Sequence, residues 1–316
     1  MNIIFAGTPD FAATHLQSLL SNGHNIIAVY TQPDRPKGRG HQLCASPVKA
    51  IALEHNIPVY QPLSFKNNES AIQEIKDINA DLMIVVAYGL LLPQEVINAP
   101  RLGCINVHGS LLPKWRGAAP IQRSLWAGDK ETGITIMKIA LALDAGDILT
   151  KASLQIDDDD TSESLYIKLA QLGSKTLCNI LPNIAYLLAN SQKQDENLVT
   201  YASKLSKEEA LIDFTQPAHI IERYIRAYQP WPVAYFSIDG QNIKVYQAQA
   251  IANNTHSKNE FGEILSFTKS GLDIVTGDNS ILRILKMQLP GKKIMNVTDI
   301  INSRKDMFAS GKILNS

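Results

Sequence analysis

Residues 104–120 read CINVHGSLLPKWRGAAP, and the stretch changes character twice over its length. It begins as an apolar run typical of a buried strand and ends in a sequence typical of the start of a helix. Asn106 and His108 lie two residues apart, so in a strand their side chains share one face. The stretch therefore predicts a strand that ends in two polar side chains at the edge of a sheet.

Short apolar runs alternate with helical patterns on both sides of this stretch. Helix starts such as Ser46-Pro47 separate the runs. Apolar strands separated by helices predict an α/β fold, a doubly wound, mostly parallel sheet that is covered on both faces. In such sheets ligands bind beyond the carboxyl ends of the strands. The expected strands are residues 2–6, 26–31, 58–61, 82–87, 103–108 and 134–138.

The second half of the chain has a different pattern. The helical pattern fades into polar residues after residue 186, and we assign residues 190–206 to a linker. It separates a catalytic domain at 1–189 from a C-terminal domain at 207–316. A helix is expected at 207–227, and short alternating runs split by turn signals then predict a small OB-like β-barrel. These runs are residues 233–238, 243–250, 262–267, 272–276 and 281–288.

Composition describes an ordinary globular protein. The 316 residues are enough for two domains, and 45% are hydrophobic and 19% charged. No apolar run approaches the ~18 residues of a membrane span, and the first residues, MNIIFAGTPD, do not resemble a signal peptide. Cys44, Cys104 and Cys178 are odd in number and far apart, which predicts reduced thiols and no structural zinc. We expect a cytoplasmic protein without a membrane partner.

Charge is unevenly distributed although the net charge is zero. Residues 204–316 contain 14 Lys and Arg and 11 Asp and Glu, a net charge of +3. Residues 1–203 contain 16 Lys and Arg and 19 Asp and Glu, a net charge of −3. This asymmetry is compatible with a basic surface that attracts phosphates, and equally with no special role.

Three polar side chains form the candidate catalytic set. An amide at Asn106 and an imidazole at His108 suit stabilisation of an oxyanion together with proton transfer. Asp144 lies in an Asp-Ala-Gly-Asp segment after the run 134–138, where a carboxylate would orient His108. Each pattern alone is equally typical of a hydrogen-bonded strand end or a solvated turn. Together they favour the catalytic interpretation.

Two other patterns do not support a metal or a dinucleotide. Residues 157–160 are four aspartates without the spacing of a calcium loop, and residues 160–163, DTSE, are typical of a helix capping box. Residues 7–11, GTPDF, lack the G-x-G-x-x-G fingerprint, and Pro9 removes an amide that could bind pyrophosphate. We therefore expect no metal, and an oxidoreductase is disfavoured.

Two loops are candidates for substrate contacts. Residues 31–41 are basic and rich in glycine, which is typical either of a loop that binds an RNA end or of disorder. Residues 88–93, YGLLLP, could hold a flat heterocycle or could be ordinary loop packing.

The chain resembles the folate-dependent formyltransferases along its whole length, and among them the members that act on methionyl-tRNA. One matching segment, INVHGSLLPKWRGAAPIQRS, is long and highly specific. Ala140, Ala142 and Ala145 stand where that family usually has Asp, Gly and Thr, so the loop around Asp144 is a point of difference. The other matching segments are FAGTPDFA, TQPDRPKGRG, VVAYGLLLP, LDAGD, YASKLSKEEA and AYQPWP.

The resemblance implies an activity and a set of site residues. It implies transfer of the formyl group of 10-formyltetrahydrofolate to the α-amino group of methionyl initiator tRNA, for translation initiation. Asn106, His108 and Asp144 match the catalytic residues, and Arg39 and Lys204 are expected to contact the tRNA. A monomer is expected. The residues expected to bind the folate are Ser110, Leu111, Leu112, Pro113, Tyr88, Leu90 and Leu92.

Four alternatives remain open at this point. A formyltransferase for a small amine, such as a glycinamide ribonucleotide or an amino sugar nucleotide, would share Asn106, His108 and Asp144. A formyl-folate hydrolase would use water as the nucleophile. An RNA-binding module without catalytic activity and a dinucleotide oxidoreductase are the remaining two.

Overall fold

The computed structural model describes residues 1–37, 42–251, 259–278 and 280–315. It divides into two compact units, neither of them continuous in sequence. Unit 1 comprises Met1–Pro120, Glu131–Gln155 and Tyr166–Ala202, and unit 2 comprises Ile121–Lys130, Ile156–Leu165 and Ser203–Ser316. The domain boundaries expected from the sequence stay a prediction.

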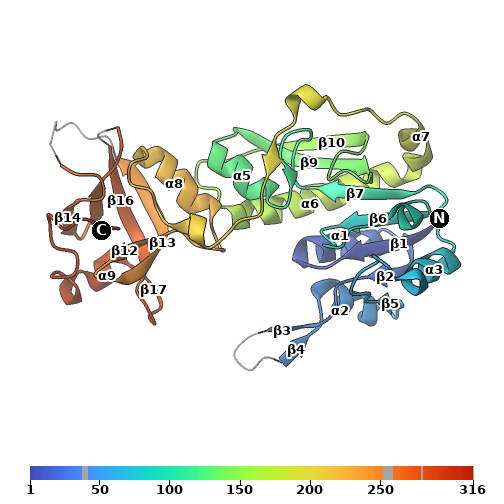
Figure 1. The fold of residues 1–316 in the computed structure, drawn as a ribbon, viewed down its shortest axis with the longest axis horizontal. Coiled ribbons are helices and arrows are strands. Elements are labelled where there is room, and N and C mark those ends of the chain that lie inside the picture. The colour runs from blue at the N-terminus through green and yellow to red at the C-terminus, as the bar shows by residue number, and fades with distance from the viewer. Residues whose placement is uncertain (38–41, 252–258, 279, 316) are drawn as a thin grey trace. The chain divides into compact units, whose positions relative to one another are not determined.

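Unit 1 is built on a seven-stranded sheet in the order β10-β9-β7-β6-β1-β2-β5 (Figure 1). The strands from β7 to β5 are parallel, while β9 runs antiparallel to β7 and β10 antiparallel to β9. The order reverses between β1 and β6, the kind of position where α/β sheets bind ligands. The strands are β1 Asn2–Gly7, β2 Asn25–Tyr30, β5 Val59–Tyr60, β6 Leu82–Val86, β7 Cys104–His108, β9 Glu131–Lys138 and β10 Ile148–Gln155.

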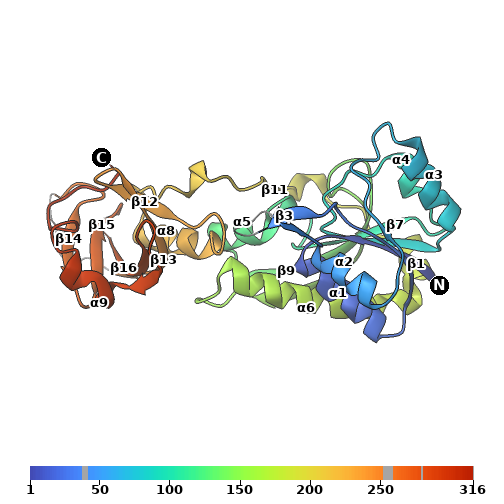
Figure 2. The same cartoon turned by 90° about the horizontal axis from the view of Figure 1, so that it is seen from below.

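Helices cover both faces of this sheet, because successive side chains of each strand point to opposite faces. Ile4 and Met83 belong to a buried cluster that α3 and α4 cover with Ile75 and Val96. Figure 2 shows α1, α2 and α6 on the other side of the sheet. The helices of unit 1 are α1 Asp10–Ser21, α2 Pro47–Glu54, α3 Glu69–Ile78, α4 Gln94–Ile97, most of α6 Ser162–Ile180, and α7 Ile184–Ala189, whereas α5 Pro120–Ala127 belongs almost wholly to unit 2.

The mostly parallel α/β sheet expected from the sequence is confirmed, but its antiparallel edge was not predicted. The run expected at 134–138 extends over all of β9. No strand was expected at β10, where half-buried and exposed residues alternate after Leu149. An edge strand with one polar face lacks the continuous apolar run that identified the central strands.

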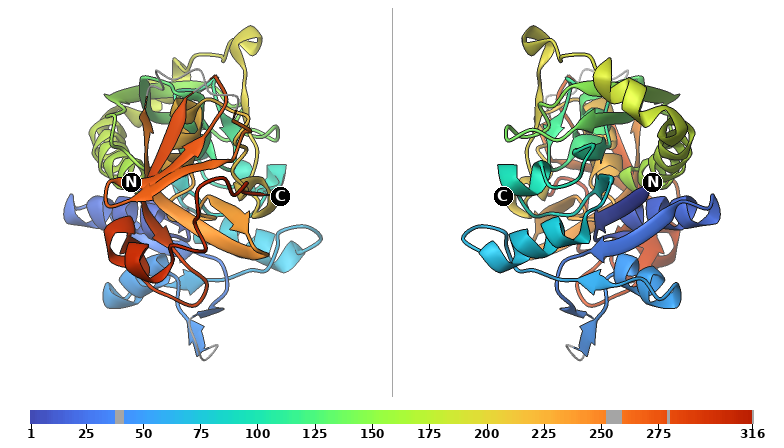
Figure 3. Two further views of the ribbon diagram at one scale, coloured as in Figure 1. Left: turned by 90° about the vertical axis from the view of Figure 1, so that its left-hand side faces the viewer. Right: turned by 90° about the vertical axis from the view of Figure 1, so that its right-hand side faces the viewer.

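Unit 2 contains an antiparallel half-barrel in the order β12-β13-β16-β15-β14, with β17 paired to β16 (Figure 3, orange to red). Its interior is apolar, with Phe236, Val245, Leu272 and Ile284 fully buried. This confirms the small barrel expected for the C-terminal part. The elements are α8 Ala218–Ala227, β12 Tyr235–Ile238, β13 Gln241–Ile251, β14 Ile264–Thr268, β15 Gly271–Val275, β16 Ile281–Gln288, β17 Ile294–Asn296 and α9 Val297–Ile300.

The helix expected at 207–227 was wrong over its first half. The structure has a short 3-10 turn at Glu208–Ala210, and α8 begins only at Ala218. Pro217 precedes α8 and disfavours helical backbone at the residue before it, so the continuous helix cannot form.

Short elements complete the chain. β3 pairs with β4 as a hairpin in the basic loop, and β8 pairs in parallel with β11. These strands are β3 Arg35–Lys37, β4 Gln42–Cys44, β8 Arg116–Gly117 and β11 Tyr201–Ala202, and the remaining 3-10 turns are Leu181–Asn183, Glu196–Leu198 and Ile301–Ser303.

Candidate active site

Strand β7 carries the first two candidate residues at the middle of the sheet. It lies between β6 and β9, with Asn106 opposite Val85 and His108 opposite Thr135. Asn106 is half-buried, and its side-chain amide makes no hydrogen bond with any residue that the structure describes. His108 is buried. The strand therefore holds one available amide donor and one enclosed imidazole on the same face.

Asp144 lies next to His108, although 35 residues separate them in the chain. The Asp144 carboxylate is 3.6 Å from Nδ1 of His108, and these side chains are only 12% and 7% exposed. The backbone N–H of Gly117 donates to the same carboxylate oxygen at 2.8 Å. The structure thus brings His108 and Asp144 together, as the sequence predicted.

The imidazole of His108 has an oxygen near each ring nitrogen. Nε2 lies 2.9 Å from the backbone carbonyl oxygen of Trp115, and Nδ1 faces the Asp144 carboxylate. An oxygen at each nitrogen fixes the orientation of the ring.

The segment Ser110–Pro113 is held by one hydroxyl of β9. Thr135 Oγ1 donates to the carbonyl oxygen of Ser110 at 2.7 Å and accepts from the backbone N–H of Leu112 at 3.0 Å. The hydroxyl of Ser110 donates to the carbonyl oxygen of Lys114 at 2.6 Å. The backbone of this turn is thus determined by buried contacts. The sequence analysis missed Thr135, because a single threonine in a strand carries no signal.

The loop after β6 is anchored to the hydrophobic core by alternate side chains, while Leu91 between them is 85% exposed. Tyr88 is buried, and Leu90 and Leu92 pack against the cluster that contains it. The carbonyl oxygen of Tyr88 accepts hydrogen bonds from the side chains of Thr8 and Gln32. This placement agrees with the packing alternative for these side chains, and their contact with a folate stays a prediction.

Arg39 and Lys204 are the two residues expected from the sequence to contact tRNA. Arg39 lies outside the described residues. Lys204 lies in unit 2 and is exposed.

The loop around Asp144 has an unusual backbone. Asp144 adopts a left-handed conformation with φ of 49°, and Ala142 is not among the residues with positive φ. Gly146 comes so close to β9 that a Cβ atom would lie 1.8 Å from the carbonyl oxygen of Lys138. The loop therefore requires glycine at 146 and tolerates alanine at 142.

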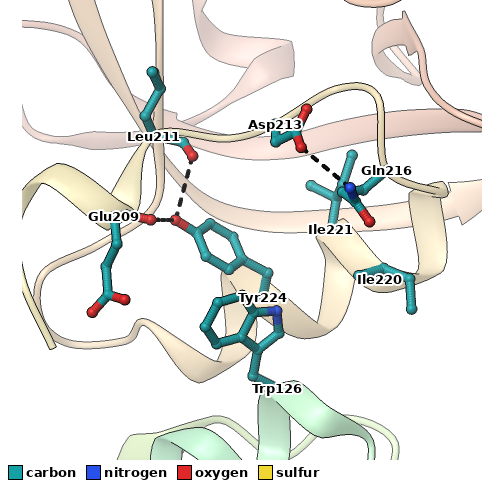
Figure 4. A pocket seen from close by; sticks show the side chains of 8 residues that line it. All are labelled: Trp126, Glu209, Leu211, Asp213, Gln216, Ile220, Ile221 and Tyr224. Atoms are coloured by element: carbon teal, nitrogen blue, oxygen red, sulfur yellow. Dashed lines mark hydrogen bonds between the residues drawn. The ribbon is translucent and has the colours of Figure 1, made fainter. Parts of the chain in front are cut away.

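A separate pocket of about 330 Å³ lies within unit 2 (Figure 4). Several of its polar groups are paired with one another or with a neighbour: Glu209 binds Arg123 at 3.1 Å, Asp213 accepts from Gln216 at 3.2 Å, and the Tyr224 hydroxyl donates to the carbonyl of Glu209. None of the predicted catalytic residues lines this pocket. These contacts indicate packing around Tyr224.

Two further observations concern metals and membranes. Among the described residues, no group of three or more His, Cys, Asp or Glu side chains is placed to hold a metal ion. In the same part of the chain, every helix is too short or too polar to cross a bilayer.

Comparison with known proteins identifies the family. The formyl transferase profile matches residues 1–181, and the profile of the formyl transferase C-terminal domain matches residues 204–305. An N-formyltransferase from Helicobacter canadensis, in complex with folinic acid and dTDP-3-aminofucose, is similar in fold at 17% identity. Its TM-score is 0.67, over 89% of this chain and 98% of that one.

Two other solved structures are similar at the level of the fold. WlaRD, a sugar 3N-formyl transferase with dTDP and 5-N-formyl-THF, has a TM-score of 0.64 at 20% identity, over 93% of this chain and 99% of that one. HypX from Aquifex aeolicus, in complex with tetrahydrofolic acid, has a TM-score of 0.62 at 16% identity over 96% of this chain. This chain spans about half the length of HypX, covering 47% of it. On the two profile matches, which together extend over most of its length, the chain belongs to the formyltransferase family.

Proposed function

We propose that this chain transfers the formyl group of 10-formyltetrahydrofolate to the α-amino group of methionyl initiator tRNA. The observation that carries the proposal is the pairing of His108 with Asp144 at 3.6 Å. His108 lies on the strand that also presents the Asn106 amide, which has no hydrogen-bond partner among the described residues. Folate compounds are bound by the Helicobacter canadensis enzyme, WlaRD and HypX, which supports a folate donor for this chain. The choice of tRNA as acceptor rests on the sequence resemblance.

The proposed reaction needs an oxyanion stabiliser and a proton donor. The neutral amine nitrogen attacks the formyl carbon, the new C–N bond forms, and the bond from that carbon to N10 of the folate breaks. An α-amine has a pKa of about 7.7–8.0, so no strong base is needed to free its lone pair. The amine nitrogen loses one proton and N10 gains one: N10 takes its proton from His108, and water carries the proton lost by the amine back to His108.

Asn106 and His108 have different proposed roles in this reaction. The Asn106 amide donates to the developing oxyanion, which is the largest contribution expected from a single neutral group. His108 is the proposed proton donor to N10, and its Nε2–H must leave the Trp115 carbonyl to reach a substrate atom. Asp144, 3.6 Å from Nδ1, holds the ring in place.

A second candidate acceptor is an amino sugar nucleotide. The Helicobacter canadensis enzyme contains dTDP-3-aminofucose, and WlaRD is a sugar 3N-formyl transferase. Both proteins share less than 25% sequence identity with this chain. The similarity therefore supports a common fold but does not identify the acceptor of this chain.

A single assay separates these functions. The purified full chain is given 10-formyltetrahydrofolate with charged initiator tRNA, charged elongator tRNA, a dTDP-amino sugar, or no acceptor. We expect N-formylmethionyl-tRNA from the initiator only. Formylation of the sugar alone would replace the proposal with the second candidate, and release of formate without an acceptor would indicate a hydrolase.

A further inference from the structure

Residues 192–202, which include most of the predicted linker, contact the candidate site from a distant part of the chain. The backbone N–H of Arg116 donates to the carbonyl oxygen of Thr200 at 2.9 Å, next to the pairing of β8 with β11. The hydroxyl of Thr200 accepts from the N–H of Trp115 at 2.9 Å. Trp115 is the residue whose carbonyl contacts His108, so this segment is attached directly to the surroundings of the imidazole.

Gln194 connects this segment to the Asp144 loop. Its Nε2 donates to the carbonyl oxygens of Asp144 and Gly146, both at 2.8 Å. Its Oε1 accepts from Nε and Nη2 of Arg116 at 3.0 and 2.9 Å. Both ends of one carboxamide are therefore occupied, the donor end by the loop and the acceptor end by Arg116.

Arg116 is a buried cation that orients Gln194. Its side chain is only 4% exposed, and its guanidinium pairs with Glu196 at 2.8 Å. The hydrogen bond from Arg116 holds the pKa of the exposed Glu196 carboxyl below its usual range. A buried guanidinium is costly unless its donors are satisfied, so Arg116 keeps Gln194 and Glu196 in place. The next residue, Gly117, donates its N–H to the Asp144 carboxylate.

The Asp144 loop needs such external contacts. Asp144 has a left-handed backbone with φ of 49°, which is unfavourable for a residue other than glycine. Leu141 and Leu143, just before it, are 70% and 61% exposed, so the loop is not held by burial of these side chains. The two bonds from Gln194 are made to the carbonyls of Asp144 and Gly146, on the turn that directs the carboxylate toward His108.

We propose that Gln194 is a positioning residue, which holds the Asp144 loop so that the carboxylate faces His108. Arg116 positions Gln194 in turn. The roles of Asp144 and His108 in catalysis rest on the proposed function. The role of Gln194 in holding the backbone of the Asp144 loop does not depend on it.

The first test is a double-mutant cycle. Gln194→Met has a similar size and removes both donors and the acceptor. We expect the single-turnover rate of formyl transfer at saturating substrates to fall about tenfold, the effect of roughly one lost hydrogen-bonded contact. In an Asp144→Asn background, Gln194→Met should lower this rate less than about twofold. The interaction between the Asp144 carboxylate and His108, which Gln194 supports, is already absent there.

The second test does not depend on activity. Exchange of the Gly117 backbone N–H, followed by NMR, reports whether the Asp144 carboxylate still accepts from it. We expect Gln194→Met to accelerate this exchange about tenfold in the free enzyme. The matched control is Gln192→Met, because the Gln192 side chain is exposed and makes no hydrogen bond with the described residues.

A second variant covers the case in which Gln194→Met does not fold. Gln194→Glu keeps an acceptor for Arg116 and removes only the donors to the loop, and the same two results are expected of it. Unchanged Gly117 exchange, or an equal loss of rate in the Asp144→Asn background, would overturn the proposal. If the wild-type chain formylates no acceptor, the proposed function fails while the exchange experiment still tests Gln194.

Discussion

At the scale of single residues, Asn106 and His108 differ although both end the same strand. His108 is enclosed and has an oxygen at each ring nitrogen, whereas the Asn106 amide is half-buried and makes no hydrogen bond within the described residues. An unpartnered donor at the carboxyl end of a central strand is available to a substrate oxygen. Asn106 is thus the residue whose removal should affect catalysis with least effect on folding.

The expected result for Asn106→Ala is a loss of about 10²–10³ in the rate of formyl transfer, the usual effect of removing one oxyanion donor. The measurement is a single-turnover assay at saturating folate and acceptor, with the melting temperature as a check on folding. Asn98→Ala is the control, because Asn98 is an exposed asparagine whose side chain accepts from the side chain of Gln94. An unchanged rate in Asn106→Ala would remove Asn106 from the mechanism.

At the scale of elements, strand β9 offers a matched pair of buried threonines. Thr135 Oγ1 holds the Ser110–Pro113 turn through two hydrogen bonds, whereas Thr132 Oγ1 is buried without a partner among the described residues. The same change, threonine to valine, should therefore have opposite consequences at the two positions.

We expect Thr135→Val to lower the free energy of unfolding by roughly 1–3 kcal/mol, because it leaves a buried carbonyl and a buried N–H unpaired. It should also raise the KM for the folate donor, if the turn forms part of the folate site. Thr132→Val should be neutral or stabilising. Urea unfolding curves measure the unfolding free energies, and initial rates measure the KM. Equal stability of the two variants would show that the hydroxyl of Thr135 does not hold the turn.

The contact between α1 and α6 contains a buried histidine. His15 is fully buried, its Nδ1 lies 2.7 Å from the carbonyl oxygen of Phe11, and a Cβ atom at Gly173 would lie 2.6 Å from its Nε2. Burial lowers the pKa of His15 to about 4, and the bond to Phe11 opposes this only in part. The folded state therefore takes up a proton at His15 less readily than the unfolded state does.

Stability should fall as the pH is lowered from about 6.5 to about 4, because the unfolded state binds this proton first. The loss attributable to His15 is on the order of 3 kcal/mol at the lower pH. His15→Leu removes the titration, so its unfolding free energy should depend less steeply on pH over this range. Parallel curves for the variant and the wild type would rule out His15 as the cause.

At the scale of the whole molecule, each unit is built from three separate segments of the chain. This affects which variants can be used to identify the acceptor substrate. Arg123 lies in the first half of the chain yet donates to Ser203 and Glu209, and Ser162 donates to the carbonyl oxygen of Ala227. These contacts lie within unit 2, so deletion of residues 203–316 would expose part of its core and would not remove the unit cleanly. Charge variants in the full chain are the sharper experiment.

If the acceptor is tRNA, Lys204→Glu should raise the KM for charged initiator tRNA about fivefold and leave the KM for the folate unchanged, because phosphate contacts dominate binding to nucleic acids. The tRNA effect should shrink as salt is raised from roughly 50 to about 200 mM. Lys66→Glu is the control, an exposed lysine of unit 1. Equal effects of the two variants would show that Lys204 has no particular role.

The sequence by itself determined the features that depend on neighbours in the chain. The shared face of Asn106 and His108 follows from the two-residue period of a strand, and the start of α2 follows from Ser46, whose hydroxyl accepts from the N–H of Lys49. The apolar runs predicted the central strands for the same local reason. Where a polar face or a proline interrupted the pattern, as in β10 and before α8, the prediction failed.

Only the tertiary structure decided the contacts between distant segments. The position of the Asp144 carboxylate depends on the N–H of Gly117 and on Gln194, which is 50 residues away in the chain. The left-handed backbone of Asp144 and the use of Thr135 to hold a turn likewise depend on partners from other elements. Such contacts have no period along the sequence, because a hydrogen bond between folded segments is set by their approach in space and not by their spacing in the chain.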